Sequence, residues 1–371
     1  MLVVGEASGD VHGAHLVEAL HRKNSQIEIF GVAGEQLQRT KFKTLLNVDQ
    51  LTGMGLIELA GNLKNLWRAY RQLCAALKQR RPNLLILIDF PEFNLRLARL
   101  AKSLGVPVLY YVSPQIWAWR QGRVKKIARW VDRMAVVFPF EEEFYARHGV
   151  KVTFVGHTLL ETVHSTRSRA EVLANLGLDQ TLPVIALLPG SRRREVHFHL
   201  PIMQAAALLL CQERKIQFLC VRASTIDRLD MEAALANSKI AIPIVEADRY
   251  DALHAADLVW AASGTATLET ALLGRPMIVV YRLSRLTYWL ARWLVRVDHV
   301  GMVNLLAGER LVPELIQDEA NPERLVAESR ALLDNQALRS TIVERLAKVR
   351  ERLGVPGAAE RVADIALGML T

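Results

Sequence analysis

The chain has 371 residues, a length that suits two domains of ordinary size, each able to bury its own core. Its content of 51% apolar and 23% charged residues excludes a disordered chain, and its three cysteines form no CxxC pair, which argues against a disulfide framework or thiolate metal site. The net charge of +9 indicates anionic partners, whether phospholipid, phosphorylated substrate or nucleic acid.

A short apolar strand at residues 2–4 opens the chain and leads directly into GEASGD and then a helix. Small residues in such a turn let a ligand approach the backbone, although the glycine spacing is not that of a dinucleotide-binding fingerprint. The apolar run is too short for a secretory signal, so we expect a cytoplasmic protein. The residues expected to line this substrate loop are Glu6, Ser8, Gly9 and Asp10.

Residues 57–70 follow a helical pattern in which an apolar stripe alternates with basic side chains. Stripes of this kind are more often core than membrane surface, so both interpretations stay open, as they do for a second stripe at residues 288–294. No window approaches the roughly 20 apolar residues of a spanning helix, so any membrane contact would be peripheral. The candidate membrane or acyl-chain contacts are Ile57, Leu63, Leu66 and Trp67.

Asp89 stands at the end of the apolar strand 84–88, followed by FPEFN. A carboxylate at the carboxyl end of a parallel strand lies at the edge where ligands bind. Partial burial beside Phe90 and Phe93 would raise its pKa and suit it to accept a proton from a sugar hydroxyl. A second interpretation, in which Asp89 caps the following helix, stays open.

Continuous apolar strands alternate with helical patterns along the whole chain, which predicts parallel sheets covered on both faces. The expected strands are residues 2–4, 27–32, 84–88, 106–112, 134–138, 184–188, 216–221, 241–245, 258–261 and 277–281. This predicts an α/β protein with two doubly wound domains. The expected divisions are residues 1–170, residues 171–345, and a helical segment 346–371 that packs back on the first domain.

The strand 184–188 ends in a tight turn that carries arginines into a helix. Unpaired N–H groups at a helix N-terminus favour an anion, and an arginine adds a fork of donors that can bind a diphosphate bidentately. We therefore expect Gly190, Ser191 and Arg192 to form a phosphate site, although a plain solvated turn stays open.

A second turn of this kind, SGTATLE, follows the strand 258–261. Ser263, Gly264 and Thr265 can offer hydroxyl and backbone donors to phosphate, and Glu269 can accept hydrogen bonds from ribose hydroxyls. A helix start with Glu269 paired to the backbone is the alternative. The pair His197 and His199 is expected to lie on a helix surface rather than to bind zinc.

Seven motifs, taken together and in chain order, resemble those of lipid-A-disaccharide synthase, glycosyltransferase family 19. They span nearly the whole chain, which makes the resemblance specific although each motif alone is modest. The motifs are GEASGD at 5–10, GMGLIE at 53–58, DFPEFN at 89–94, SPQIWAWR at 113–120, LLPGSR at 187–192, SGTATLE at 263–269 and NLLAGERLVPELIQ at 304–317.

The resemblance implies a GT-B type fold, with two Rossmann-like domains facing across a cleft, and an inverting transfer that uses no metal or other cofactor. It implies UDP-2,3-diacylglucosamine as donor and 2,3-diacylglucosamine 1-phosphate as acceptor, with lipid A disaccharide 1-phosphate and UDP as products. It also implies peripheral association with the cytoplasmic face of the inner membrane, an anionic surface. A homodimer is left open.

Carried onto this sequence, the family's motifs put the base at Asp89, diphosphate contacts at Ser191 and Arg192, and a ribose or uridine contact at Glu269. Asn304 is a further donor-site candidate. The alternatives are another UDP-N-acetylglucosamine-using GT-B enzyme (peptidoglycan glucosaminyl transferase or 2-epimerase), a lipid-binding scaffold, and a nucleic-acid-binding protein. The last is disfavoured because no nucleic-acid module accompanies the basic residues.

Overall fold

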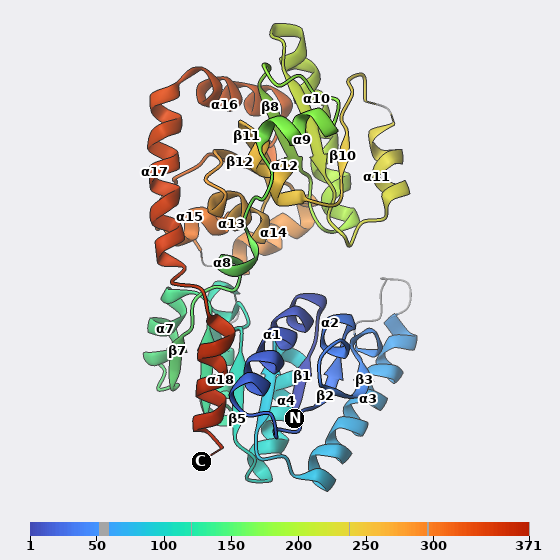
Figure 1. The fold of residues 1–371 in the computed structure, drawn as a ribbon, viewed down its shortest axis with the longest axis vertical. Helices are drawn as coiled ribbons and strands as arrows, with labels where there is room; N and C mark the ends of the chain where they lie inside the picture. Colours follow the sequence, from blue (N-terminus) through green and yellow to red (C-terminus); the bar gives the residue numbers. More distant parts are fainter. Residues whose placement is uncertain (52–58, 120, 237, 295–296, 371) are drawn as a thin grey trace. The chain divides into compact units, whose positions relative to one another are not determined.

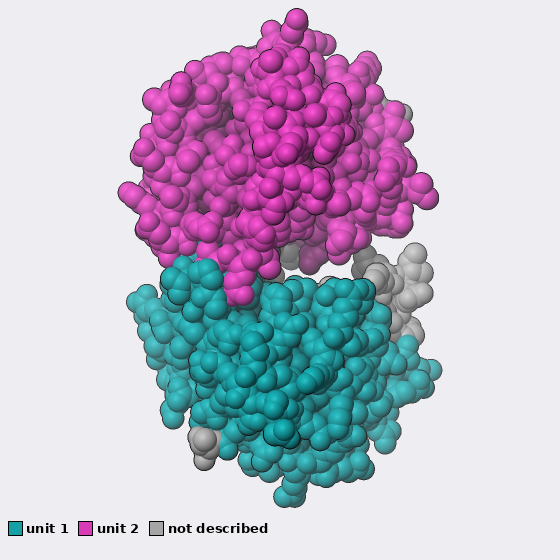
Figure 2. Space-filling view, in the orientation of Figure 1, with its two compact units in different colours: residues 1–158, 353–371 teal, residues 159–352 magenta. Residues whose placement is uncertain are grey.

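The chain folds into two compact units, which are coloured separately in Figure 2. Unit 1 combines residues 1–158 with residues 353–371, and unit 2 comprises residues 159–352. The computed structural model describes residues 1–51, 59–119, 121–236, 238–294 and 297–370.

Unit 1 is built on a parallel sheet with the strand order β3-β2-β1-β4-β5-β6-β7 (Figure 1). Strands β1, β4 and β5 are buried throughout, as expected of strands covered on both faces. The strands are β1 (Leu2–Val4), β2 (Phe30–Ala33), β3 (Lys43–Asn47), β4 (Leu85–Ile88), β5 (Val108–Tyr111), β6 (Arg133–Val136) and β7 (Val152–Phe154).

Helices connect these strands and pack on the sheet, α1 against β1 and β4, and α4 against β4 and β5. The helices of unit 1 are α1 (Ala7–Lys23), α2 (Glu35–Gln38), α3 (Leu59–Arg80), α4 (Pro91–Ser103), α5 (Ile116–Trp119), α6 (Val124–Trp130), α7 (Pro139–Ala146) and α18 (Ala358–Gly368). Short 3₁₀ turns lie at Val48–Gln50 and Gln121–Arg123.

Unit 2 repeats the plan with a second parallel sheet in the order β10-β9-β8-β11-β12-β13. Its strands are β8 (Val184–Leu188), β9 (Gln217–Val221), β10 (Ile244–Val245), β11 (Leu258–Ala262), β12 (Met277–Tyr281) and β13 (Glu314–Ile316). Its helices are α8 (Leu159–Thr162), α9 (Arg169–Asn175), α10 (Arg193–Glu213), α11 (Arg228–Leu235), α12 (Arg249–Ala255), α13 (Thr265–Leu272), α14 (Arg285–Leu294), α15 (Met302–Ala307), α16 (Pro322–Asp334) and α17 (Gln336–Arg352), with a 3₁₀ turn at Gln317–Glu319.

Each of the expected strands is present in the described ranges, and three further strands, β3, β7 and β13, complete the edges of the two sheets. An edge strand has only one neighbour, so it needs less apolar sequence than a central strand. The sequence KTLLN of β3 leaves its first two residues exposed, and β7 is half-buried throughout. Neither segment is a continuous apolar run, which is why the pattern of the sequence misses them.

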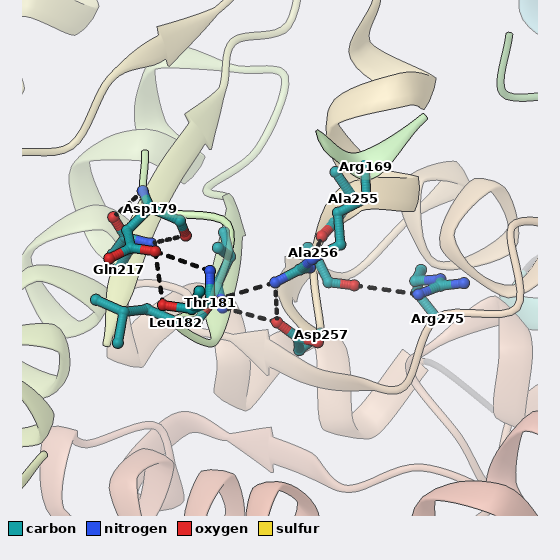
Figure 3. A network of polar contacts seen from close by, with 10 residues as sticks. Arg169, Asp179, Thr181, Leu182, Gln217, Ala255, Ala256, Asp257 and Arg275 are labelled. Carbon is teal, nitrogen blue, oxygen red and sulfur yellow. Dashed lines mark hydrogen bonds and ion pairs between the residues drawn. The ribbon is translucent and has the colours of Figure 1, made fainter. Parts of the chain in front are cut away.

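The chain passes from unit 1 to unit 2 after Thr158, earlier than the expected division at residue 170. Polar contacts shown in Figure 3 explain part of this difference. The Arg169 guanidinium donates to the Asp257 carboxylate at 3.0 Å and to the Leu182 carbonyl at 3.1 Å, both in unit 2. Asp251 accepts hydrogen bonds from the backbone N–H groups of residues 166 and 167. Residues 165–169 therefore belong to unit 2.

The last helix, α18, belongs to unit 1, where it packs against α1 near the start of the chain (Figure 1). Val362, Ala363 and Ala366 of α18 are buried. The expected C-terminal segment began at residue 346, but Leu346 and Val349 are buried residues of α17 in unit 2. The chain thus returns to unit 1 at Leu353.

Candidate active site

Both sheets have a point at which the strand order reverses, and in open α/β sheets ligands bind at such points, outside the carboxyl ends of the strands. In unit 1 the point lies between β1 and β4, which Gly5 and Asp89 directly follow. In unit 2 it lies between β8 and β11, followed by the turns that contain Gly190 and Gly264. The topology therefore brings the predicted turns of each unit to its own ligand-binding edge.

Asp89 and Phe90 both adopt left-handed backbone conformations, with φ of 53° and 46°. Such a conformation costs energy in a residue other than glycine and persists only when its surroundings hold it. The buried Asn94 does so: its Nδ2 donates to the Ile88 carbonyl at 3.1 Å and to the Asp89 carbonyl at 2.7 Å. The Tyr110 hydroxyl also donates to the Asp89 carbonyl. These hydrogen bonds fix the backbone of Asp89 and thereby the direction in which its side chain leaves the turn.

This geometry excludes one of the two interpretations of Asp89, the helix cap. The N-cap residue of α4 is Phe90, and no side chain caps that helix. Asp89 is therefore not the helix cap. Gly5 faces this turn, where an added Cβ would stand 2.1 Å from the Phe90 Cβ, so only glycine fits at the end of β1.

The Asp89 carboxyl group has a shifted proton affinity. Burial raises its pKa to about 7, and the negative charge of Glu6 adds to the shift. A Cβ built on Gly9 would lie 3.7 Å from Asp89 Oδ2, so the first turn of α1 stands next to this carboxylate. A carboxyl group with a pKa near neutrality, at a ligand-binding edge, has the properties of a general base.

The remaining residues of the expected substrate loop divide into two groups. Glu6 and Ser8 are exposed at the start of α1. Asp10 is buried, and its carboxylate accepts hydrogen bonds from the backbone N–H groups of Gly34 and Gln36, each at 2.7 Å, and of Leu37 at 3.2 Å. Asp10 thus anchors the start of α2, a role that its position in the motif did not indicate.

In unit 2, the turn after β8 depends on Gly190. Its φ is +129°, and a Cβ there would stand 2.4 Å from the Glu195 Cβ. The exposed Ser191 donates its N–H to the Glu195 carboxylate at 2.9 Å. Arg192 is the N-cap residue of α10; no side chain caps this helix, and the Arg192 guanidinium is exposed. The turn therefore already holds a carboxylate oxygen on a backbone N–H group, as an anion cradle does.

His199 holds this turn in place through two hydrogen bonds of its ring. The expectation that both histidines lie on the helix surface is wrong for this residue. His197 is exposed, but His199 is fully buried. Its Nε2 accepts from the Arg282 N–H at 3.0 Å, so its Nδ1 carries the proton and donates to the Pro189 carbonyl at 2.9 Å. Burial lowers the pKa of the ring. The neutral imidazole thereby joins the end of β8 to the end of β12.

The second turn of unit 2 opens α13 with Gly264 as N-cap, at a φ of +140°. Thr265 is exposed. The Ser263 hydroxyl donates to the Val300 carbonyl at 2.7 Å, so it fixes a neighbouring loop. The N-terminus of α13 has no side-chain cap, and in its first turn the Thr267 N–H donates to the Gly264 carbonyl at 3.1 Å.

Glu269 is buried on α13 and pairs with side chains of α12 rather than with the backbone. Its Oε1 accepts hydrogen bonds from the Arg249 guanidinium and, at 3.3 Å, from the Tyr250 hydroxyl. Burial raises the pKa of Glu269, and the charge of Arg249 works against that rise. The helix start with Glu269 paired to the backbone is therefore absent. Sequence reasoning missed Arg249, because no motif surrounds it.

Asn304 is fully buried, and its side chain is occupied within unit 2. Its Nδ2 donates to the Val312 carbonyl at 2.9 Å and to Glu314 Oε1 at 2.8 Å, while its Oδ1 accepts from the Val312 N–H at 2.9 Å. Glu314 in turn accepts from the N–H groups of Val300 and Gly301. Asn304 thus holds the loop before α15 and has no surface on which to contact a ligand in this structure.

The apolar stripe expected at residues 57–70 is only partly covered by the structure. Ile57 and the side chain of Leu63 lie outside the described residues. Leu66 is half-buried, and Trp67 is 61% exposed on α3 with the Arg71 guanidinium 4.6 Å from its ring centroid. Among the helices described, none has the length and apolar character needed to cross a membrane. Nor do the described histidines, cysteines and acids form a group of three that could hold a metal ion.

Solved structures with the same arrangement confirm the GT-B type α/β fold. A putative UDP-N-acetylglucosamine 2-epimerase from Listeria monocytogenes superposes with a TM-score of 0.66 at 16% identity, covering 98% of this chain and 94% of that one. The glycotransferase of kitacinnamycin gives a TM-score of 0.65 at 14% identity, covering 97% and 95%. At such identities the likeness concerns the fold alone.

Sequence comparison goes further than the fold. The family model described as lipid-A-disaccharide synthetase matches residues 1–364. The lipid-A-disaccharide synthase of Syntrophus aciditrophicus is 45% identical over 372 residues, and that of Geobacter metallireducens is 46% identical over 371 residues; each alignment covers 100% of this chain and 97% of the relative. The chain belongs to the lipid-A-disaccharide synthase family, the glycosyltransferases of lipid A biosynthesis.

Proposed function

We propose that the protein transfers the sugar of UDP-2,3-diacylglucosamine to 2,3-diacylglucosamine 1-phosphate with inversion, and that Asp89 is the general base. The observation that carries the proposal is the Asp89 carboxyl group, held at the ligand-binding edge of unit 1 with a pKa of about 7. A base with a pKa near the working pH is deprotonated often enough to act and basic enough to take a proton.

In the proposed reaction Asp89 takes the proton of the acceptor's primary hydroxyl as the oxygen attacks the anomeric carbon. The bond from that carbon to the diphosphate breaks on the opposite face, and UDP leaves with the bonding electrons. The new glycosidic bond then joins the two sugars, and Asp89 carries the proton.

Unit 2 holds the donor in this proposal. The diphosphate binds at Gly190, Ser191 and Arg192, where its oxygens replace the Glu195 carboxylate on the Ser191 N–H. The N-terminus of α13, from Gly264 to Thr265, supplies further donors. The charge that develops on the leaving diphosphate is stabilised by Arg192 and the two helix N-termini. Support for a UDP-sugar ligand comes from a fold neighbour, the UDP-GlcNAc 2-epimerase of Neisseria meningitidis, solved bound to UDP-GlcNAc.

The other residues of the donor site have different roles in this proposal, one in binding the ligand and two in positioning loops. Glu269 binds the ribose hydroxyls once Arg249 and Tyr250 release part of its carboxylate. Ser263 and Asn304 position the loops that carry the site, since their side chains are engaged by the backbone at Val300 and Val312. In unit 1, Glu6, Ser8 and Gly9 face the acceptor.

The test of the proposed reaction uses purified protein in mild detergent with both substrates, followed by mass spectrometry. Lipid A disaccharide 1-phosphate with stoichiometric UDP is the expected result. Donor that is only hydrolysed or epimerised would overturn the proposal in favour of another UDP-sugar enzyme. Lipid binding without any UDP release would indicate a non-catalytic scaffold.

We also propose that the enzyme works peripherally on the cytoplasmic face of the inner membrane, with the α3 stripe of Leu63, Leu66 and Trp67 as one contact. Both substrates carry acyl chains, and the chain carries a net charge of +9. Replacing these three residues by serine should release the protein from anionic vesicles in sedimentation. Unchanged sedimentation would remove α3 from the membrane surface. Sedimentation velocity at several concentrations tests whether the enzyme is a homodimer.

A further inference from the structure

Helix α14 exposes two tryptophan side chains and two arginine side chains to solvent. Trp289 and Trp293 are 78% and 82% exposed, the highest values among the large apolar side chains that the structure describes. Arg285 and Arg292 are exposed on the same helix. These four residues are spaced at i, i+4, i+7 and i+8, so they share one helical face. We call them the Trp-Arg face of α14.

The stretch of sequence that carries this face has charge of a single sign. The sequence from residue 270 to residue 297 contains arginines and no aspartate or glutamate. Arg282, directly after β12, is exposed like Arg285 and Arg292. No ion pair or hydrogen bond of the Arg285 or Arg292 side chain occurs within the described part of the chain. The face therefore combines two exposed indole rings with two arginines that have no acidic partner among the described residues.

This combination matches the chemistry of an anionic bilayer surface. Tryptophan favours the boundary between headgroups and acyl chains, because its ring is apolar while its N–H can bond water or phosphate. Arginine binds phosphate bidentately and is attracted to anionic lipid. At ten residues α14 is about 15 Å long, so it would lie in the plane of the surface rather than cross it.

We propose that the Trp-Arg face of α14 docks on an anionic phospholipid bilayer and is a membrane contact of unit 2 in its own right. An isologous contact with a second copy is less favourable, because a twofold axis on this face would bring the same arginines together. Partition into a bilayer instead gives both residue types partners, the indoles with the interface and the guanidinium groups with lipid phosphate.

This proposal rests on the proposed function, because it names the surface at which the enzyme would bind its acylated substrates. Vesicle binding is measured without substrate, so this proposal and the proposed function can fail independently. Vesicle binding that is lost on changing α14 would stand even if the chain transferred no sugar. Conversely, transfer in detergent would stand even if α14 never touched lipid.

The experiment compares the full chain with the double variant Trp289→Ser/Trp293→Ser. Flotation with phosphatidylcholine vesicles containing about a third phosphatidylglycerol should show binding reduced at least tenfold in the variant. The matched control is Leu229→Ser on α11 of the same unit, whose side chain is 73% exposed and should leave binding unchanged. Because all three side chains are exposed, thermal unfolding should be unaffected, which separates loss of binding from loss of fold.

A charge variant, Arg285→Gln/Arg292→Gln, should remove most of the preference for phosphatidylglycerol over pure phosphatidylcholine vesicles and most of the sensitivity to salt. Vesicle binding of the tryptophan variant equal to that of the unaltered chain would overturn the proposal. Conversion of a dimer to a monomer, with vesicle binding unchanged, would assign the face to a second copy instead. Turnover lost equally on detergent-dispersed substrates would assign it to the substrates' acyl chains, which also overturns it.

Discussion

At the residue scale, the role proposed for Asp89 depends on how that residue is held in unit 1. Its left-handed backbone is held by hydrogen bonds from Asn94 and Tyr110, and its half-buried carboxyl group has a pKa raised to about 7 by desolvation. The backbone geometry depends on Asn94 and Tyr110, whereas the raised pKa comes from desolvation and from the charge of Glu6. The two can therefore be tested separately, through the carboxyl group and through the residues that position it.

We expect Asp89→Asn to lower turnover by about 10²-fold or more while leaving UDP affinity intact, the usual size of a general-base effect. In the unaltered enzyme, kcat/KM should fall as the pH drops below about 7, because protonated Asp89 cannot act. A pH profile of kcat/KM and calorimetry of UDP binding check both statements. Turnover close to normal in the variant would remove Asp89 from the role of base.

The same substitution should raise stability above neutral pH. The folded-state pKa of Asp89, about 7, exceeds the ordinary value of 3.8 for an aspartate side chain. The folded protein therefore binds the proton more tightly than the unfolded chain does and loses stability as the pH rises between the two values. The cost of the buried charge at pH 8 has an upper limit of about 4 kcal/mol. Asp89→Asn removes this cost. The variant should therefore have a higher free energy of unfolding in urea than the unaltered protein at pH 8, and the same free energy of unfolding at pH 4.

Asn94 should behave as a positioning residue for Asp89. Without its two hydrogen bonds to carbonyl oxygens, the turn relaxes and the Asp89 carboxylate gains solvent. We expect Asn94→Leu to lower kcat by roughly tenfold to a hundredfold, the size that a misplaced catalytic group produces. The midpoint of the pH profile should also move below 7. Lower thermal stability with an unmoved midpoint would show that Asn94 is only a structural residue.

In unit 2, Arg192→Ala should weaken UDP binding by about tenfold or more, since hydrogen bonds to charged groups contribute about 1.5–3 kcal/mol. The UDP affinity of Arg192→Lys should lie between those of the unaltered protein and of Arg192→Ala, because lysine keeps the charge but not the planar fork of donors. Arg194→Ala is the matched control, because this arginine is also exposed at the start of α10. Equal UDP affinity in the Arg192 and Arg194 variants would argue against a diphosphate contact at Arg192.

At the element scale, the phosphate turn depends on the junction of β8 with α10. We expect Gly190→Ala to lower both UDP affinity and the melting temperature, because alanine is strained at a φ of +129° and its Cβ would meet Glu195. Gly122→Ala serves as the control, since nothing lies within 4 Å of its added Cβ. An unchanged melting temperature in Gly190→Ala would mean that the turn adapts more easily than its geometry indicates.

On the scale of the whole molecule, the chain ends in the unit where it began. Helix α18 packs on α1 through buried residues such as Val362, while the exposed Asp364 pairs with Lys23 at 2.8 Å. We expect Val362→Asp to lower the melting temperature strongly, because it buries a charge without a partner. Asp364→Ala should cost less than about 1 kcal/mol, as exposed ion pairs do. Similar thermal unfolding of the two variants would show that α18 contributes little to unit 1.

The sequence by itself determined the architecture and indicated where the candidate site lies. Continuous apolar strands such as residues 84–88 and 184–188 predicted two doubly wound domains, because a strand buried on both faces needs apolar residues at every position. The turns after those strands predicted Asp89 and the segment from Gly190 to Arg192, since ligands bind at the carboxyl ends of parallel strands.

Only the tertiary structure decided which of these side chains are available. Asp10, Ser263 and Asn304 stand in the right motifs, yet their polar atoms bond backbone groups from other segments of their own unit. His199 and Arg249 join the candidate site through partners distant in sequence, such as Arg282 and Glu269. A linear pattern records which residues follow a strand, whereas hydrogen bonding and burial depend on segments that only folding brings together.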